Sequence, residues 1–139
     1  MKTLRIGVAG LGRAFALMAP AFRDPRVQLV AAADPREEAC QRFKQDYAGK
    51  TFTSVEELCS DPAVDVVYVA TPNEVHAAHA RSACSRKKHV LVEKPMALSL
   101  AECRAMVDAA RENGVQLLVG HSHSFDLPVL RTRELIQSG

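Results

Sequence analysis

Short apolar runs alternate with stretches of helical spacing along the whole chain, and this alternation constrains the fold more than any other feature. Runs of this length suit strands buried on both faces, as in a parallel sheet whose crossover connections are helices. Right-handed crossovers stack such strands into one doubly wound α/β sheet. The expected strands are Leu4 to Ala9, Val27 to Ala33, Thr51 to Thr53, Val66 to Ala70, His89 to Val92 and Gln116 to Gly120.

One helix has clear signals at both ends. Ser99 followed by Glu102 predicts a capping box at its start, and Asn113-Gly114 is typical of a helix end. Helical spacing predicts that four of its side chains point toward the core: Cys103, Met106, Val107 and Ala110.

The other helices are predicted from weaker punctuation. Pro20 falls inside the helix that begins near Gly12, so we expect a kink or a restart there. Ser54, with Glu57 three residues later, predicts a short helix. Three more are expected from Asp34-Pro35 to about Asp46, from Asn73 to about Arg86 and from Leu127 to Ser138, the last with an apolar stripe of Leu130, Leu135 and Ile136 that we expect to be exposed.

Composition narrows the classes of partner. Eighteen basic and 16 acidic residues give a net charge of +2, which is too small to attract nucleic acid or anionic lipid electrostatically. We therefore expect a small-molecule partner and neither nucleic acid nor membrane. The first apolar run is short and interrupted by glycines, so it favours a strand over a secretory signal. The four cysteines form no C-x-x-C pair and are interpreted as buried residues of a reducing, cytoplasmic compartment.

The segment I-G-V-A-G-L-G-R joins the first expected strand to the first expected helix. Gly10 permits a tight turn there, Gly12 lets a pyrophosphate approach the backbone, and free N–H groups follow at Arg13 and Ala14. Phe15 takes the place of the third glycine of G-x-G-x-x-G, so we expect looser packing of this helix on the strand. By itself the motif also fits an ordinary strand-to-helix turn in another α/β protein.

Asp34 ends the second expected strand, where a carboxylate accepts both hydroxyls of an adenine ribose. The same carboxylate repels a 2′-phosphate, so NAD is predicted over NADP, although Arg36 is close enough to offset that repulsion. Asp34 also fits as a helix N-cap, alone or in addition. FAD proteins and methyltransferases share this arrangement of glycines and carboxylate, and residues further along the chain discriminate between the classes.

Two further motifs end the fourth and fifth expected strands, Y-V-A-T-P-N from Tyr68 and H-V-L-V-E-K-P from His89. Ligands of open α/β sheets bind at such carboxyl ends. In order and spacing, these motifs, the glycine turn and Asp34 together resemble the glucose-fructose oxidoreductase and inositol dehydrogenase family, often written Gfo/Idh/MocA. The resemblance covers nearly the whole chain. It implies a Rossmann-type NAD(P)-binding domain at residues 1–124, and at residues 125–139 the first helix of an α+β substrate domain absent from this chain.

The resemblance also implies roles for individual residues. The lysine of E-K-P, here Lys94, is the expected catalytic residue: its ammonium favours the alkoxide character of a substrate hydroxyl and so promotes hydride transfer to nicotinamide. In the family, an aspartate and a histidine of the second domain complete the site, and the full-length proteins associate, so a homo-oligomer is implied. Pro95 is expected to follow a cis bond. Cofactor contacts are implied at Thr71, Pro72, Asn73, Glu93 and Lys94.

The histidines are weighed separately. The run G-H-S-H-S-F-D, with G-L-G-R-A-F, resembles the phthalate cis-dihydrodiol dehydrogenases of the same family, so His121 and His123 are candidates to face a substrate. Many family members carry an arginine near this position, and its absence leaves the substrate open among sugars, polyols and cis-dihydrodiols. His76 is predicted at the cofactor edge, and His79 and His89 as fillers. No carboxylate or cysteine lies at ligand spacing from these histidines, so no metal site is predicted.

Three functions remain open from the sequence. The first is an NAD-dependent dehydrogenase, of which this chain alone is expected to be inactive. The second is a non-catalytic NAD-binding module that senses redox state or serves regulation. The third is a folded relic whose cofactor groove is weakened by Phe15. Lys94 favours the first function, because a binding module has no need of that lysine, and Asp34 disfavours the third.

Overall fold

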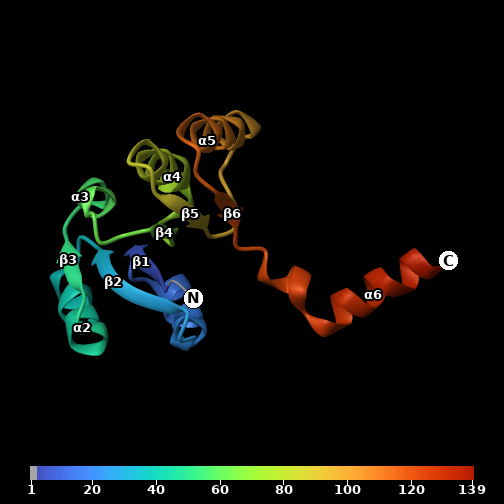
Figure 1. Ribbon diagram of the computed structural model, residues 1–139, viewed down its shortest axis with the longest axis horizontal. Helices are drawn as coiled ribbons and strands as arrows, with labels where there is room; N and C mark the ends of the chain where they lie inside the picture. The colour runs from blue at the N-terminus through green and yellow to red at the C-terminus, as the bar shows by residue number, and fades with distance from the viewer. Residues whose placement is uncertain (1–2) are drawn as a thin grey trace.

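A computed structural model describes residues 3–139. Its centre is one parallel sheet of six strands in the order β3-β2-β1-β4-β5-β6 (Figure 1). This is the doubly wound α/β arrangement that the alternation of apolar runs predicts. The strands are β1 (Leu4–Ala9), β2 (Val27–Ala33), β3 (Lys50–Phe52), β4 (Val66–Val69), β5 (His89–Val92) and β6 (Leu117–Val119).

Helical segments connect the strands. The α-helices are α1 (Arg13–Met18), α2 (Glu37–Tyr47), α3 (Val55–Ser60), α4 (His76–Ser85), α5 (Leu100–Asn113) and α6 (Leu127–Ser138). The 3-10 helices are η1 (Ala19–Arg23), η2 (Asn73–Val75) and η3 (Ser122–Phe125). No helix among residues 3–139 has the length and apolar character needed to cross a membrane.

The sheet separates two apolar layers because successive side chains of a strand point to opposite faces. In β4, Val67 and Val69 belong to the layer that α3, α4 and α5 cover, whereas Tyr68 belongs to the layer of α1 and α2. The sheet is thus buried on both faces, which explains why its strands read as unbroken apolar runs.

Most of the helix punctuation is confirmed. Ser54 accepts a hydrogen bond from the Glu57 amide at 3.2 Å, and Ser99 accepts one from Glu102 at the same distance. Gly114 ends α5 in the left-handed conformation, with φ of 66°. The restart expected at Pro20 is also present, since α1 gives way to η1 there.

Three local predictions were wrong. Val107 was expected inside, but its side chain is 43% exposed, because α5 turns Met106 and Ala110 toward the sheet and leaves Val107 at the side. The helix expected from Asp34-Pro35 begins at Glu37, with Arg36 as its N-cap. The segment after Asn73 is first a 3-10 turn and becomes α-helical at His76.

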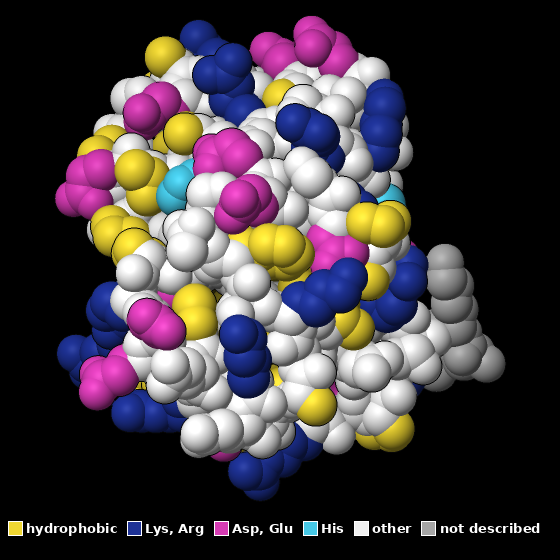
Figure 2. All heavy atoms as spheres, turned by 90° about the vertical axis from the view of Figure 1, so that its left-hand side faces the viewer, with side chains coloured by type: hydrophobic (Ala, Val, Ile, Leu, Met, Phe, Trp, Pro, Cys, Tyr) yellow, Lys and Arg dark blue, Asp and Glu magenta, His cyan; other side chains and the backbone are white. Residues whose placement is uncertain are grey.

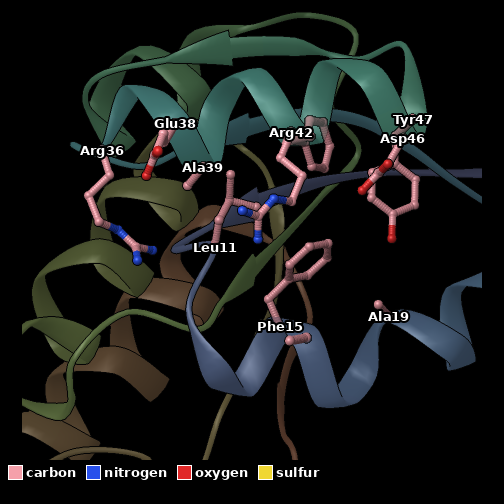
Figure 3. Close-up of a pocket in the computed structure, with 11 residues that line it drawn as sticks. Leu11, Phe15, Ala19, Arg36, Glu38, Ala39, Arg42, Asp46 and Tyr47 are labelled. Carbon is pink, nitrogen blue, oxygen red and sulfur yellow. The ribbon is translucent and has the colours of Figure 1, made fainter.

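Phe15 lies in an aromatic cluster rather than against the strand alone. Its ring centroid is 6.4 Å from that of Phe22, 6.2 Å from Phe43 and 6.0 Å from Tyr47. Phe15 is buried and points from α1 toward α2 (Figure 3). The bulk that replaces the third glycine therefore fills the space between two helices and contributes to the core.

The C-terminal helix α6 stands apart from the sheet (Figure 1). Of its apolar stripe, Leu135 and Ile136 are exposed as expected, and Leu130 is half-buried. Cys40, Cys59 and Cys84 are buried free thiols, as the sequence predicts, while Cys103 is half-buried. Burial raises the pKa of the Cys59 thiol to about 11, which leaves it protonated and unreactive at neutral pH.

Candidate functional site

The predicted site residues gather where the strand order reverses. The chain runs outward from β1 to β2 and β3 on one side, and from β4 to β5 and β6 on the other, so the carboxyl ends of β1 and β4 flank a topological switch point (Figure 1). Ligands of open α/β sheets bind in the crevice at such a point. Gly10, Asp34, Thr71 and Glu93 each follow directly, or within two residues, the carboxyl end of a strand at this edge.

The two glycines of the first turn differ in why they are needed. Gly10 has φ of +91°, and a Cβ atom there would lie 2.7 Å from the carbonyl oxygen of Ala70, so the fold itself requires glycine. Gly12 has φ of −86°, and a Cβ atom there would meet nothing within 4 Å. Neither conformation nor packing therefore demands glycine at position 12. A side chain there would only fill the open space beside the backbone.

Asp34 ties the ends of β1 and β2 together. Its side chain is 5% exposed; Oδ2 accepts a hydrogen bond from the Leu11 amide at 2.8 Å, and Oδ1 accepts one from the Arg36 amide at 2.9 Å. The Arg36 guanidinium donates to both oxygens at 2.9 Å. Burial acts to raise the pKa of Asp34, but the hydrogen bonds from Arg36 and Leu11 outweigh it and leave the pKa lowered. The carboxylate is therefore ionised and held at the turn.

The loops after β4 and β5 meet above the first turn of α4. His76 is 1% exposed; its Nε2 lies 2.8 Å from the carbonyl oxygen of Thr71, and its Nδ1 lies 2.9 Å from that of Pro95. Pro72 and Asn73 lie on the surface of this edge. The Lys94-Pro95 peptide bond is cis, which confirms the expectation for E-K-P.

Glu93 has a partner that sequence reasoning missed. The Tyr68 hydroxyl donates to Glu93 Oε1 at 2.8 Å, and Glu93 Oε2 accepts from the Lys94 amide at 3.2 Å. Burial, followed by the hydrogen bond to Glu93, raises the pKa of Tyr68 far above its usual value, so the phenol remains protonated. A tyrosine in an apolar strand was the available signal, because a buried phenol needs a hydrogen-bond partner.

Lys94 and the two candidate substrate histidines are exposed. Within residues 3–139, the ammonium of Lys94 has no hydrogen-bond or ion-pair partner. His121 precedes η3, and His123 Nδ1 lies 2.8 Å from Asp126 Oδ2. No hydrogen bond or ion pair in this part of the chain joins either histidine to Lys94 or Asp34. Both histidines follow the carboxyl end of β6, at the same edge of the sheet but without a hydrogen bond to the other candidate residues.

A groove of about 340 Å³ lies next to the Asp34 side of the site, between α1 and α2. Phe15 and Leu11 line it, Arg42 points into it from α2, and Arg36, just before α2, lies at one end (Figure 3). The neighbouring face around α2 and α3 has interspersed basic and acidic side chains (Figure 2). Among residues 3–139 no group of three or more His, Cys, Asp or Glu side chains is arranged to hold a metal ion.

Comparison with known proteins decides the family. Residues 4–121 match the model of the "Oxidoreductase family, NAD-binding Rossmann fold", Gfo/Idh/MocA. The chain belongs to this family. The family predicted from the glycine turn, Asp34 and the T-P-N and E-K-P motifs is thus confirmed. The NAD-binding Rossmann domain and the oxidoreductase function of the family are confirmed with it.

Two relatives show the range of the family. The chain is 52% identical over 138 residues to 1-carboxy-3-chloro-3,4-dihydroxycyclo hexa-1,5-diene dehydrogenase of Comamonas testosteroni, covering 98% of this chain and 35% of that protein. It is 32% identical over 139 residues to myo-inositol 2-dehydrogenase of Thermotoga maritima, covering 98% of this chain and 41% of the relative. The chain therefore spans well under half the length of these relatives.

Solved structures agree with this assignment. The WlbA dehydrogenase of Bordetella pertussis, in complex with NADH and UDP-GlcNAcA, superposes with a TM-score of 0.94 at 27% identity, over 99% of this chain and 40% of that one. GenD2 from gentamicin A biosynthesis, in complex with NAD, superposes with a TM-score of 0.91 at 31% identity, over 97% of this chain and 39% of that one. Both have the fold seen here, and both were solved with the dinucleotide.

Proposed function

We propose that this chain binds NAD in preference to NADP and serves the oxidation of a hydroxyl group on a small polyol or cis-dihydrodiol. The observation that carries the proposal is Asp34. It is a buried, ionised carboxylate at the end of β2, linked to the amide of Leu11 in the glycine turn. A carboxylate at this place accepts ribose hydroxyls and repels a 2′-phosphate.

The rest of the edge fits a dinucleotide. The open space beside Gly12 leaves its backbone accessible to a pyrophosphate, with the amides of Arg13 and Ala14 following it. The guanidinium of Arg36 is hydrogen-bonded to Asp34, where the ribose is proposed to bind. It therefore has to give up at least one of these hydrogen bonds when the ribose hydroxyls bind the carboxylate. Along the crevice, the remaining contacts fall to Thr71, Pro72, Asn73, Glu93 and Lys94.

Lys94 is the proposed catalytic residue. NAD, when bound, would supply the hydride acceptor. The unpartnered ammonium of Lys94 donates a hydrogen bond to the substrate oxygen and stabilises the negative charge that grows there as the hydroxyl proton passes to a general base of the second domain, and it so lowers the barrier to hydride departure. Glu93, oriented by Tyr68, accepts a hydrogen bond from the Lys94 amide and so fixes the backbone that carries the lysine.

The substrate class is inferred from the two relatives described above. The Comamonas testosteroni protein is named for a dihydroxycyclohexadiene that bears a carboxyl group, and the Thermotoga maritima protein for an inositol. Both substrates carry vicinal hydroxyl groups on a six-membered ring. We place His121 and His123 on the substrate side, where Asp126 orients the His123 ring and leaves its Nε2 free to meet a hydroxyl.

Titration calorimetry with NAD and NADP tests the cofactor assignment directly. We expect tighter binding of NAD, and a loss of about 1–3 kcal/mol for Asp34→Ala, the scale of hydrogen bonds to a charged acceptor. Asp108→Ala is the matched control, because Asp108 is an exposed carboxylate on α5 whose only ion pair among residues 3–139 is with Arg111 at 3.6 Å. Equal or tighter binding of NADP by the unmodified chain refutes the preference and assigns the 2′-phosphate to Arg36.

A further inference from the structure

His76 is the most deeply buried polar side chain at this edge. It opens α4 and is 1% exposed, whereas Pro72, Asn73, Lys94 and Pro95 above it are all exposed. The sequence places His76 at the cofactor edge, but the structure leaves it almost no surface with which to touch a ligand. Its contacts lie entirely inside the protein.

Both ring nitrogens of His76 face backbone carbonyl oxygens of different loops. Nε2 is 2.8 Å from Thr71 O, in the loop after β4, and Nδ1 is 2.9 Å from Pro95 O, in the loop after β5. Carbonyl oxygens only accept hydrogen bonds, so His76 is the donor wherever a ring nitrogen bears a proton. The ring thereby links two loops that belong to different strands.

A second histidine supports the first loop. His79, one turn further along α4, has its Nδ1 3.0 Å from the Thr71 hydroxyl oxygen. Burial lowers the pKa of His79, so its imidazole is neutral at neutral pH. Thr71 is thus held at its carbonyl by His76 and at its side chain by His79, and these two contacts account for the ring positions of both histidines.

We infer that His76 is a positioning residue for Lys94. By joining Pro95 to Thr71, it fixes the E-K-P loop against the T-P-N loop, so that the Lys94 ammonium is presented at a constant place in the crevice. The exposed side chains of these loops supply little packing of their own, and the constraint therefore comes from beneath. This inference rests on the function proposed above for Lys94.

The experiment compares three variants of the chain by amide hydrogen exchange and by calorimetry with NAD and with ADP-ribose, which lacks nicotinamide. His76→Phe keeps an aromatic ring but removes both ring nitrogens, and His76→Gln restores a side-chain donor. Cys84→Ala, at a fully buried position of α4 away from both loops, controls for loss of stability alone.

For His76→Phe we expect about tenfold faster exchange over residues 70–75 and 93–97, with little change in the other strands. The affinity for NAD should fall at least about threefold more than the affinity for ADP-ribose, because the loop of Lys94 lies at the nicotinamide end of the proposed site. His76→Gln should recover part of both effects, and Cys84→Ala should reproduce neither.

Two results overturn the inference: unchanged exchange of both loops in His76→Phe, or equal losses for NAD and ADP-ribose matching those of Cys84→Ala. If the unmodified chain does not bind NAD, the proposed function fails, while the exchange data still decide the link between the loops. If His76→Phe does not fold, nitrogen-15 spectra of the unmodified chain decide instead. We expect a His76 ring N–H protected from solvent, and a freely exchanging ring contradicts the link.

Discussion

The two ends of the crevice are held by different kinds of contact. At the end of β2, Asp34 is clamped by a guanidinium whose side chain is 61% exposed. At the ends of β4 and β5, the contacts come from side chains that are almost fully buried, His76 beneath the loops and Tyr68 beneath Glu93. At the first end a buried carboxylate is paired with a guanidinium that lies largely in solvent, and the second end is a set of buried hydrogen bonds.

This difference predicts how each end responds to a ligand. The Arg36 guanidinium already lies largely in solvent, and ribose hydroxyls replace its hydrogen bonds to the buried carboxylate, so Arg36 moves away from Asp34 at small cost when a ribose binds. A buried acceptor that loses its donor costs about 1–3 kcal/mol, so the loops around His76 and Glu93 keep one arrangement. Binding can adapt at the β2 end, whereas the geometry of Lys94 stays constant.

The largest expected effect concerns Lys94 itself. In a chimera that joins this chain to the remainder of the Comamonas testosteroni relative, Lys94→Ala should lower kcat by about 100-fold or more, the scale of general acid–base catalysis. NAD affinity should change by less than about threefold, because a residue that acts in the transition state affects turnover rather than binding.

Steady-state NADH formation on a cis-dihydrodiol, with calorimetry on the same protein, checks this prediction. Lys87→Ala is the control, since Lys87 is an exposed lysine whose ammonium contacts the Asn113 carbonyl far from the crevice. Turnover that survives within about twofold would remove Lys94 from the mechanism.

Tyr68→Phe tests the rigidity of the β4 and β5 end. The variant removes the donor to Glu93 Oε1 and leaves a half-buried carboxylate with one partner fewer, so the free energy of unfolding should fall by about 1–3 kcal/mol. Urea denaturation measures it. Tyr47→Phe is the control: Tyr47 lies in the same aromatic cluster as Phe22, on which Tyr68 also packs at 5.4 Å between ring centroids, and the Tyr47 hydroxyl has no hydrogen-bond partner among residues 3–139. Its loss should cost less than about 0.5 kcal/mol.

Arg36→Ala tests the adaptability of the β2 end. Without the guanidinium, Asp34 keeps its hydrogen bonds from the backbone amides of Leu11 and position 36, and the lone pairs that the guanidinium occupied become free for ribose hydroxyls. The cation that offsets repulsion of a 2′-phosphate is gone. NAD should bind equally well or up to about fivefold more tightly, the scale of about one hydrogen bond, while NADP weakens. A weaker NAD complex of Arg36→Ala would mean that the guanidinium holds the cofactor instead of competing with it.

The smallest expected effect lies in acid. The pKa of Asp34 is lowered in the folded protein, so its contribution to stability is complete above the unfolded value near 3.8 and is lost as the pH falls through the lower folded value. Asp34→Asn should therefore lower stability at neutral pH and flatten the loss of stability below about pH 5. Unfolding followed at several pH values measures the slope, and a slope equal to that of the unmodified chain contradicts the assignment.

Local patterns determined the architecture and the family. The alternation of apolar runs with helical spacing, the Ser54 and Ser99 caps, and the restart at Pro20 depend on residues close together in the chain, and the structure has them as predicted. The order of the glycine turn, Asp34, T-P-N and E-K-P identified the family for the same reason. Such signals are complete within a few residues, since backbone conformation and side-chain spacing decide them.

Only the tertiary structure decided which partner each polar side chain found. The hydrogen bond that Tyr68 donates to Glu93 joins residues 25 apart in the chain. His76 bridges the carbonyl oxygens of two loops, one of them 19 residues away. Val107 is exposed although its helical spacing points inward, because the position of α5 over the edge of the sheet sets which side of the helix is covered. Burial of a polar group is favourable only beside a matching partner, and that match depends on how the loops of separate strands come together.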